Sequence, residues 1–535
     1  MRLTRARGIA LVAAAAATVL SLSACGGSSG AADSTTTLSI AWPATPTQLD
    51  PNVYTDLSWV YGLDGYMETL VDYDTSEASD DQVLDVDAAQ PALAKSFEVS
   101  KDKTQYTFKL REGVMSEHGN ELTADDVIWS FKRMYSDPAS NQAGVLLPTA
   151  NVDADAPWTK IDKYTVRFNL TQPSAVVMST LAYPLMGIID SDEAKKHATE
   201  DDPWASEWLS SHSASFGAYK LAVLEPGQEL RLEYNPNYWG EKPEFTEIVI
   251  KSVPDASSRA QLLMSGEVDM ISEPPIEQLE GIKDSSTAEV SVQPDSNRHN
   301  LSLNTDVPAL GKPLVRRAIS HAINRKALVD SVYQGYTGPA DAPLSRAVLP
   351  DQPTTGEYDP ERAEELLIEA GYADGFEMTL SYNTGRPGPY AEDMARLIQS
   401  DLKAVGIDAS LKSVPSTADF EGAVSEQQME AYLYTERPAI PEAAYSLYLY
   451  LHSKSALNNS GYENAEFDKA VVEALGLSGG KRREQLIDKA VGILAEEEPT
   501  VSLVEVPDLV GIATSLEGYT ALPSGGVKFD ELKRS

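Results

Sequence analysis

Alternating apolar and polar residues predict strands in two early stretches of the chain. Tyr106, Phe108 and Leu110 alternate with polar residues, and the same period of two runs through residues 164–170. Successive side chains of a strand point to opposite faces, so this period is typical of a strand with one buried face. Both stretches are therefore predicted to be half-buried strands.

A helix is predicted to begin between these two strands, after Thr123. The Thr123 side chain can accept a hydrogen bond from a free amide of the first turn, and Asp126 can reach back to the amide of Thr123. Val127, Ile128 and Phe131 then recur at helical spacing, which predicts a single apolar face.

Two later regions repeat the order strand, helix, strand. The expected elements are a strand at 247–253, a helix at 257–265 and a strand at 268–271, then a strand at 376–382, a helix at 390–405 and a strand at 407–414. Gly266 and Gly406 follow the two helices, where glycine commonly ends a helix because it tolerates a positive φ. Strands joined through a helix pair in parallel, so this order predicts mixed α/β domains.

Length and charge narrow the class of protein. The chain has 535 residues, which is long for one hydrophobic core and predicts two or three domains. Its formal charge of −38 argues against nucleic acid as a partner and against anionic lipid at the bulk of its surface. An acidic surface of this kind keeps an exported protein soluble.

Residues 1–24 have the pattern of an export signal. Three arginines precede a short apolar stretch at residues 9–22, which is too short to span a bilayer, where about 20 residues are needed. The only cysteine of the chain, Cys25, follows directly after Leu-Ser-Ala. This ending resembles the lipobox of bacterial lipoproteins. It implies that Cys25 is lipidated and holds the protein at the extracytoplasmic face of the cell membrane.

Residues 25–37 are predicted to form a flexible tether. After the cysteine they consist of glycine, serine, threonine and alanine with one aspartate. Such small and polar residues cannot bury a core, and they behave as a flexible coil. The first apolar alternation starts at Leu38, so the folded part is expected to begin there.

A series of short motifs, in a fixed order, carries a family resemblance. The motifs are LDPN at 49–52, YMETLV at 66–71, PALAKSFEVSKD at 91–102, YTFKLREGV at 106–114, LTADDV at 122–127, NPNYWG at 235–240, SGEVD at 265–269, VRRA at 315–318, AINR at 322–325 and EAGY at 369–372. Together they resemble family 5 of the bacterial extracellular solute-binding proteins, which serve peptide and nickel ABC importers. The resemblance covers nearly the whole chain after the tether.

This resemblance implies an α/β, two-lobed, periplasmic-binding-protein-like fold of type II, with an extra subdomain inserted in the first lobe. The expected parts are the first lobe at 38–72, the inserted subdomain at 73–212, the rest of the first lobe at 213–295, the second lobe at 296–499 and a return to the first lobe at 500–535. It also implies a monomeric receptor without a cofactor. Such a receptor captures extracellular peptides or peptide-like solutes by lobe closure and delivers them to ABC permease subunits in the membrane.

The ligand of such a fold lies between the lobes, so loops at strand ends on both sides should supply its contacts. From the first lobe, Trp42, Tyr54, Trp59 and Phe216 are candidates for stacking on a solute. From the second lobe, Arg386 lies in a loop between a strand and a helix. In dipeptide-binding relatives an arginine of the corresponding loop holds the ligand's carboxylate, and a guanidinium suits this role because it donates two parallel hydrogen bonds.

One departure from those relatives leaves the solute open. They carry an aspartate-rich segment that grips the peptide's ammonium group, whereas this chain has Glu436, Arg437 and Glu442 there. Either glutamate can substitute for the aspartate, but Arg437 opposes a cation. Arg386 and Arg437 together would instead suit an anionic or metal-chelate solute. Tyr445 is a further candidate contact, in a run that fits either a helix or a strand.

Other chemistry finds little support in the residues. The six histidines include no H-x-x-x-H pair. The two stretches that match G-x-S-x-G, residues 26–30 and 476–480, follow no predicted strand, so neither is a nucleophile elbow. The glycine-rich residues 476–481 lack the spacing of a phosphate loop and are predicted to join two helices. No metal site and no catalytic residue is therefore predicted, and the protein is interpreted as a binding protein. A lipoprotein sensor that binds without transporting is the remaining alternative.

Overall fold

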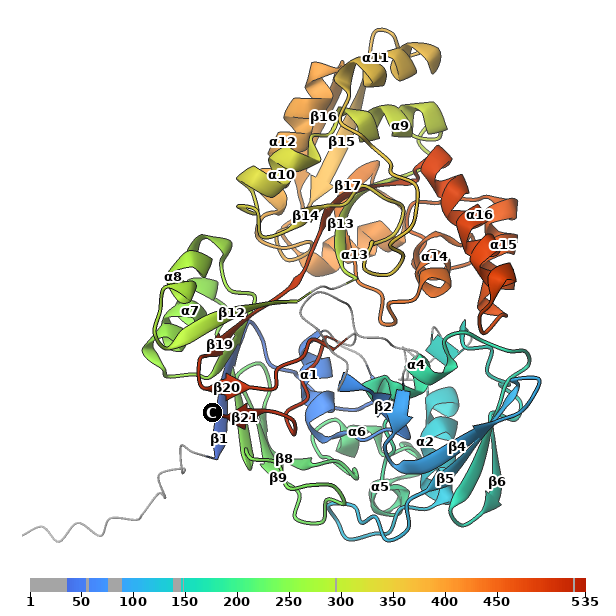
Figure 1. Cartoon of the computed structure of the whole chain (residues 1–535), viewed down its shortest axis with the longest axis vertical. Helices are drawn as coiled ribbons and strands as arrows, with labels where there is room; N and C mark the ends of the chain where they lie inside the picture. Colours follow the sequence, from blue (N-terminus) through green and yellow to red (C-terminus); the bar gives the residue numbers. More distant parts are fainter. Residues whose placement is uncertain are drawn as a thin grey trace, which may run out of the picture.

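The computed structural model describes residues 36–53, 57–75, 89–137, 146–147, 149–293, 296–522 and 525–535. Cys25 and the predicted export signal lie outside these ranges. Within them, none of the helices has the length and apolar character needed to span a bilayer. The described residues form two lobes, each built on its own β-sheet, and the predicted two-lobed α/β fold is confirmed (Figure 1).

The first lobe, lobe I, contains a sheet of seven strands in the order β12-β19-β11-β1-β10-β9-β8. The strands are β1 Thr37–Trp42, β8 Tyr219–Glu225, β9 Glu229–Tyr234, β10 Glu247–Ser252, β11 Met270–Ser272, β12 Ala288–Gln293 and β19 Asp508–Ala513. The central strand β1 is parallel to both β10 and β11. The predicted helix between β10 and β11 is α7, Ala256–Ser265, and it ends at Gly266 with a φ of 73°. Helix α1, Leu57–Tyr66, and the short η3, Ile276–Gln278, and α8, Leu279–Lys283, complete this lobe with the β20 (Leu516–Glu517) and β21 (Lys533–Arg534) pair.

A subdomain is inserted in lobe I around a second sheet, of order β4-β5-β7-β6. Its elements are β2 Val71–Tyr73, β3 Ala89–Pro91, β4 Ala94–Val99, β5 Gln105–Leu110, α2 Ala124–Ser136, β6 Trp158–Asp162, β7 Thr165–Asn169, α4 Val177–Ala182, η2 Pro184–Met186, α5 Ser191–His197 and α6 Ser206–Leu209. The two alternating stretches of the sequence are β5 and β7. The predicted capping box of Thr123 and Asp126 is confirmed at the start of α2.

A buried ion-pair network joins this subdomain to lobe I. Arg133 of α2 donates to Asp50 Oδ1 and Oδ2 at 2.7 and 2.5 Å, and to Asn52 Oδ1 at 2.5 Å. Asp137, one turn further along α2, lies 3.1 Å from the same guanidinium. The LDPN motif therefore has a structural role here, because it compensates the charge of a fully buried arginine.

The second lobe, lobe II, has six strands in the order β14-β18-β13-β17-β15-β16. They are β13 Arg298–Leu303, β14 Gly338–Pro339, β15 Phe376–Tyr382, β16 Ile407–Ser413, β17 Ala431–Glu436 and β18 Thr500–Glu505. The helices are α9 Pro313–Ala322, α10 Arg325–Ser331, α11 Pro360–Glu369, α12 Ala391–Ala404, α13 Thr417–Ser425, α14 Ala443–Leu451, α15 Ala465–Leu475 and α16 Lys481–Glu497. The predicted strand, helix, strand unit is β15-α12-β16, with parallel strands.

Among the described residues, consecutive strands lie in different lobes at two places, β12 to β13 and β18 to β19 (Figure 1). The second crossing comes later than the predicted boundary at residue 500. Strand β18 pairs with β13 and buries Val501, Leu503 and Val504 in the second lobe. The return to lobe I therefore starts after Glu505, because the apolar run before it completes the lobe II core.

Candidate functional site

The carboxyl ends of parallel strands in the two lobes meet at the space between them. In lobe II, β15 and β17 run in parallel, so the loops after Tyr382 and Glu436 leave the same edge of the sheet. In lobe I, β1, β10 and β11 also share one direction. The segment after β11 contacts the segment after β15, because the Ile276 amide donates to Tyr390 Oη at 3.0 Å. These two edges therefore face each other, and loops at such edges are where α/β proteins bind ligands.

Arg386 is held in the loop after β15 by its own neighbours. Asn383 Oδ1 accepts from the Gly385 and Arg386 amides, each at 2.8 Å, and Asn383 Nδ2 donates to the Val414 carbonyl at 2.6 Å. The guanidinium lies 4.4 Å from the ring centre of Tyr434 and 3.2 Å from a Glu421 oxygen. With 39% of its side chain exposed, Arg386 still presents a cationic surface at the edge that faces lobe I.

The next two candidates follow at the end of β17. Glu436 lies opposite Arg298 in the antiparallel pair of β13 and β17, and its Oε2 accepts from Arg298 Nε at 2.8 Å and Nη2 at 2.6 Å. Both side chains are buried, so the Glu436 charge is compensated within lobe II. The Arg437 amide donates to Tyr450 Oη at 2.9 Å. Burial raises the pKa of Asp508 at the start of β19, and the hydrogen bond from Tyr519 and the charge of Arg437 oppose this rise.

Glu442 and Tyr445 lie at the start of α14. The run around Tyr445, which fitted either a helix or a strand in the sequence, is therefore a helix. Glu442 is the N-cap residue, and its carboxylate accepts from the Ala444 and Tyr445 amides at 3.0 and 2.9 Å. It also forms an ion pair with Arg483 of α16. The Tyr445 side chain is buried in the apolar cluster that includes lobe I. Both glutamates predicted to bind an ammonium group therefore already have cationic partners.

The first-lobe candidates are less exposed than a stacking role requires. Trp42 ends β1 with 2% of its surface exposed, and Phe216 is completely buried in the lobe I core. In this conformation neither ring offers a free face to the space between the lobes. Trp59 lies in α1, but its side chain is outside the described residues, and so is Tyr54.

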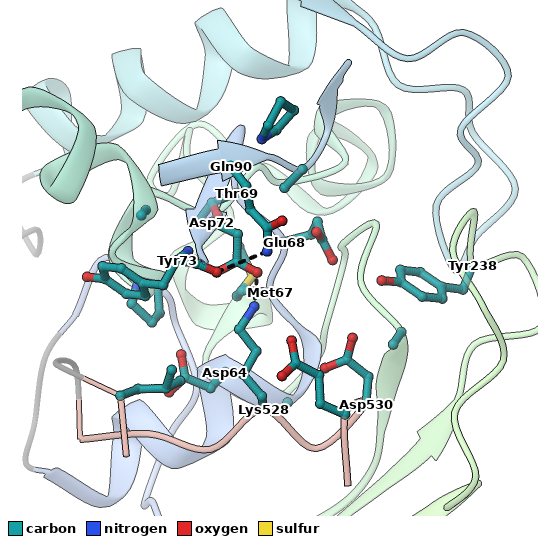
Figure 2. Close-up of a pocket in the computed structure, with 18 of the residues that line it drawn as sticks. Asp64, Met67, Glu68, Thr69, Asp72, Tyr73, Gln90, Tyr238, Lys528 and Asp530 are labelled. Atoms are coloured by element: carbon teal, nitrogen blue, oxygen red, sulfur yellow. Dashed lines mark hydrogen bonds and ion pairs between the residues drawn. The ribbon is translucent and has the colours of Figure 1, made fainter. Parts of the chain in front are cut away.

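A second feature, which the sequence did not predict, is an acidic cavity of about 260 Å³ between lobe I and its inserted subdomain. The segment after α1, strand β3 and the C-terminal residues Leu522, Lys528, Asp530 and Glu531 line it. Figure 2 shows the Lys528 side chain reaching toward Asp72, with which it forms an ion pair, while Asp64 and Asp530 lie nearby. Burial raises the pKa of Glu68 in this cavity to about 8; Lys528 and Arg111 lower it, and Asp530 raises it further. These residues are far apart in sequence, so no local sequence pattern predicted that they would line one cavity.

Glu68 should make the stability of the protein depend on pH. An ordinary glutamate has a pKa of 4.5, and the folded protein raises that of Glu68 to about 8. The stabilisation that comes from proton binding is therefore complete below pH 4.5 and is lost as the pH rises through 8. Between pH ~5 and ~7 we expect a loss of about 2–3 kcal/mol in the free energy of unfolding. Chemical denaturation across this range should show a flatter profile for Glu68→Gln; identical profiles would refute the assignment.

The described part of the chain contains no cluster of metal-ligating side chains. There, no three side chains of histidine, cysteine, aspartate or glutamate gather closely enough to hold an ion. His118 instead contacts the Ser213 carbonyl at 3.0 Å, and His299 contacts Thr435 Oγ1 at 2.8 Å. Burial lowers the pKa of His299 to about 4, so this histidine is neutral near pH 7.

Comparison with known proteins gives consistent matches over most of the chain. Residues 88–458 match the family model described as bacterial extracellular solute-binding proteins, family 5 Middle. Heme-binding protein A of Haemophilus influenzae is 28% identical over 459 residues, 82% of this chain and 82% of that protein. The probable ABC transporter periplasmic-binding protein SapA of Escherichia coli is 26% identical over 533 residues, 92% of this chain and 94% of that protein. The solved structure of DppA from Helicobacter pylori, in complex with the peptide STSA, is 25% identical with a TM-score of 0.80, covering 93% of this chain and 98% of that one.

Proposed function

Because the chain belongs to family 5 of the bacterial extracellular solute-binding proteins, we propose that it is the substrate-binding subunit of an ABC importer. It captures extracellular peptides or peptide-like solutes between its lobes and passes them to permease subunits in the membrane. The observation that carries this proposal is the opposed pair of sheet edges, with Arg386 at the lobe II edge. Two solved structures with bound peptides, of DppA with STSA and of a dipeptide binding protein with Met-Leu, share the fold over 93% of this chain.

The mechanism is closure of the lobes around the solute. A ligand that touches both lobes binds the closed arrangement more tightly than the open one, and the difference in affinity shifts the population toward the closed form. The permease then recognises that form. Nothing in this cycle requires a covalent step, and we assign the chain no enzymatic activity.

Lipidation of Cys25 is proposed to keep the receptor at the membrane. The cysteine follows an export signal and precedes a small, polar tether. Cys25→Ala should release the protein from the membrane fraction into the medium or periplasm, which cell fractionation followed by immunoblotting measures. Retention of the variant in the membrane fraction would contradict this anchor.

Arg386 is proposed to hold the carboxylate of the solute. Arg386→Ala should weaken binding of the peptide Ser-Thr-Ser-Ala by about 1–3 kcal/mol, because a charge-assisted pair is lost. The matched control is the same peptide with a C-terminal amide, which should bind wild type and variant equally. Titration calorimetry measures both; an equal loss for acid and amide, or no loss for either, would contradict the role of Arg386.

An anionic solute is the second candidate, and one observation favours it. Glu436 and Glu442 are buried with cationic partners, Arg298 and Arg483. Arg386, which also forms an ion pair with Glu421, and Arg437 both follow strand ends at the edge that faces lobe I. Native mass spectrometry of the full mature chain, gently extracted in detergent, identifies what it carries. Short peptides of mixed sequence would support the peptide receptor; a single small anion or metal chelate would replace it by the second candidate.

A further inference from the structure

A short segment of lobe I is docked in the core of lobe II, next to the first crossing of the chain. It consists of η3 and α8, residues 276–283, and we refer to it as the peg. The side chains of Ile276 and Leu279 are 4% and 0% exposed, and they belong to the same cluster of buried apolar side chains as the lobe II core. Burial of these two lobe I side chains among the side chains of lobe II stabilises the contact between the two lobes.

Lobe I holds the base of the peg rigidly. Arg259 of α7 is 2% exposed and donates to the Ser272 and Glu273 carbonyls at 3.2 and 3.0 Å, and to the Val253 and Pro254 carbonyls at 2.8 and 2.9 Å. Pro274 and Pro275 then lead directly to Ile276. Because each proline restricts its φ, the Ile276 amide stands at a nearly fixed position relative to the lobe I sheet.

Two tyrosines of lobe II form hydrogen bonds with the peg. Tyr390 Oη accepts from the Ile276 amide at 3.0 Å and donates to Glu277 Oε2 at 3.3 Å. Tyr336 bonds to Glu280, and its ring lies 4.4 Å from Lys283 Nζ. The Tyr390 ring also packs on Tyr333, with ring centres 5.7 Å apart, so the side chain has little freedom to follow the peg alone.

Tyr390 is the last residue of the loop that carries Arg386. The loop starts at the completely buried Asn383, whose side chain bonds the Gly385 and Arg386 amides. It ends at Tyr390, which is the N-cap residue of α12. The loop is therefore anchored to the lobe II core at one end and to lobe I at the other, with Arg386 between the two anchors.

We propose that Tyr390 is a positioning residue for solute binding. Through its hydroxyl it couples the angle between the lobes to the placement of Arg386. Relative rotation of the lobes moves the peg, the peg moves Tyr390, and Tyr390 moves the loop. The coupling rests on the proposed function, because it matters for affinity only if Arg386 contacts the solute. The hydrogen bond between Tyr390 and the peg exists in the protein without ligand, and it is tested in that state.

The first test is hydrogen exchange of the full mature chain without ligand, comparing wild type with Tyr390→Phe. The variant keeps the ring that packs on Tyr333 and loses the hydroxyl, which accepts from the Ile276 amide and donates to Glu277 Oε2. We expect faster exchange at Ile276 and at the Gly385 and Arg386 amides, with an unchanged melting temperature. Tyr358→Phe, at an exposed tyrosine, is the matched control and should leave these amides unchanged. Faster exchange at Ile276 alone, or at none of these amides, would overturn the coupling.

The second test is a double-mutant cycle read as affinity for the peptide Ser-Thr-Ser-Ala. Tyr390→Phe should weaken binding roughly two- to tenfold in the wild-type background, as expected when the hydrogen bonds of its hydroxyl to the peg are lost. In the Arg386→Ala background it should have no further effect, because the group that it positions is gone. Equal losses in both backgrounds would show that Tyr390 acts on stability or closure without Arg386. If the wild type does not bind this peptide, the peptide assignment fails. The hydrogen-exchange experiment still decides whether Tyr390 links the peg to the loop that carries Arg386.

Discussion

Replacing Arg133 by methionine should destabilise the protein by about 3–5 kcal/mol, because the change leaves two buried carboxylates without their cation. Asp50 and Asp137 both lie within 3.1 Å of the Arg133 guanidinium, and the side chains of all three residues are at most 5% exposed. The variant should also lose the contact between lobe I and the inserted subdomain that Asp50 provides. Equilibrium denaturation, followed by tryptophan fluorescence, measures the change in the free energy of unfolding.

The control for this prediction is a pair of the same kind at the surface. Lys95 and Glu112 are 3.3 Å apart, but their side chains are 46% and 64% exposed. Lys95→Met should therefore cost less than about 1 kcal/mol, since solvent screens such a pair. A loss for Arg133→Met that is no larger than the loss for Lys95→Met would contradict the assigned role of the network.

Glu436→Ala should cost a similar amount, about 3–5 kcal/mol, because it removes the carboxylate that forms an ion pair with the buried Arg298. Arg298 would keep hydrogen bonds to the Ala342 carbonyl at 3.2 Å and to Ser502 Oγ at 3.1 Å, which do not neutralise its charge. The same denaturation experiment separates this role from ligand binding. If Glu436 instead served to hold a solute ammonium, the variant would lose affinity and keep its stability.

A double variant tests the reason for that loss. Arg298→Met combined with Glu436→Leu removes both charges and fills the space with apolar side chains. It should recover most of the stability that Glu436→Ala loses, because the cost of an unpaired buried charge is gone. A double variant less stable than Glu436→Ala would show that packing or hydrogen bonds, and not the unpaired charge, cause the loss.

The placement of one candidate-site residue, Arg386, could be predicted from the sequence. The position of Arg386 followed from a strand, a loop and a helix that are adjacent in sequence, and the structure places it at the lobe II edge facing lobe I. The availability of Glu436 and Glu442 could not be predicted in the same way. Their partners, Arg298 and Arg483, are 138 and 41 residues away in the chain, and only the fold brings them together. The role of Arg386 toward a solute remains a prediction.

The first-lobe aromatic residues illustrate the same limit. Phe216 was a candidate for stacking because an aromatic ring in a loop suits either a ligand or a core. The choice depends on which side chains surround the ring, and the structure surrounds Phe216 with the lobe I core. The acidic cavity around Glu68 was not predicted at all, since its walls come from the segment after α1 and from the C-terminal residues.

The sequence by itself determined the local elements of this protein and its family. The capping box of Thr123, the helix end at Gly266 and the parallel β15-α12-β16 unit depend on residues a few positions apart, so the amino-acid order contains them. Only the tertiary structure decided which charges are compensated, where the second crossing begins and how the peg meets Tyr390. These features depend on contacts between segments far apart in the chain, and such contacts form only when both lobes have folded and packed against each other.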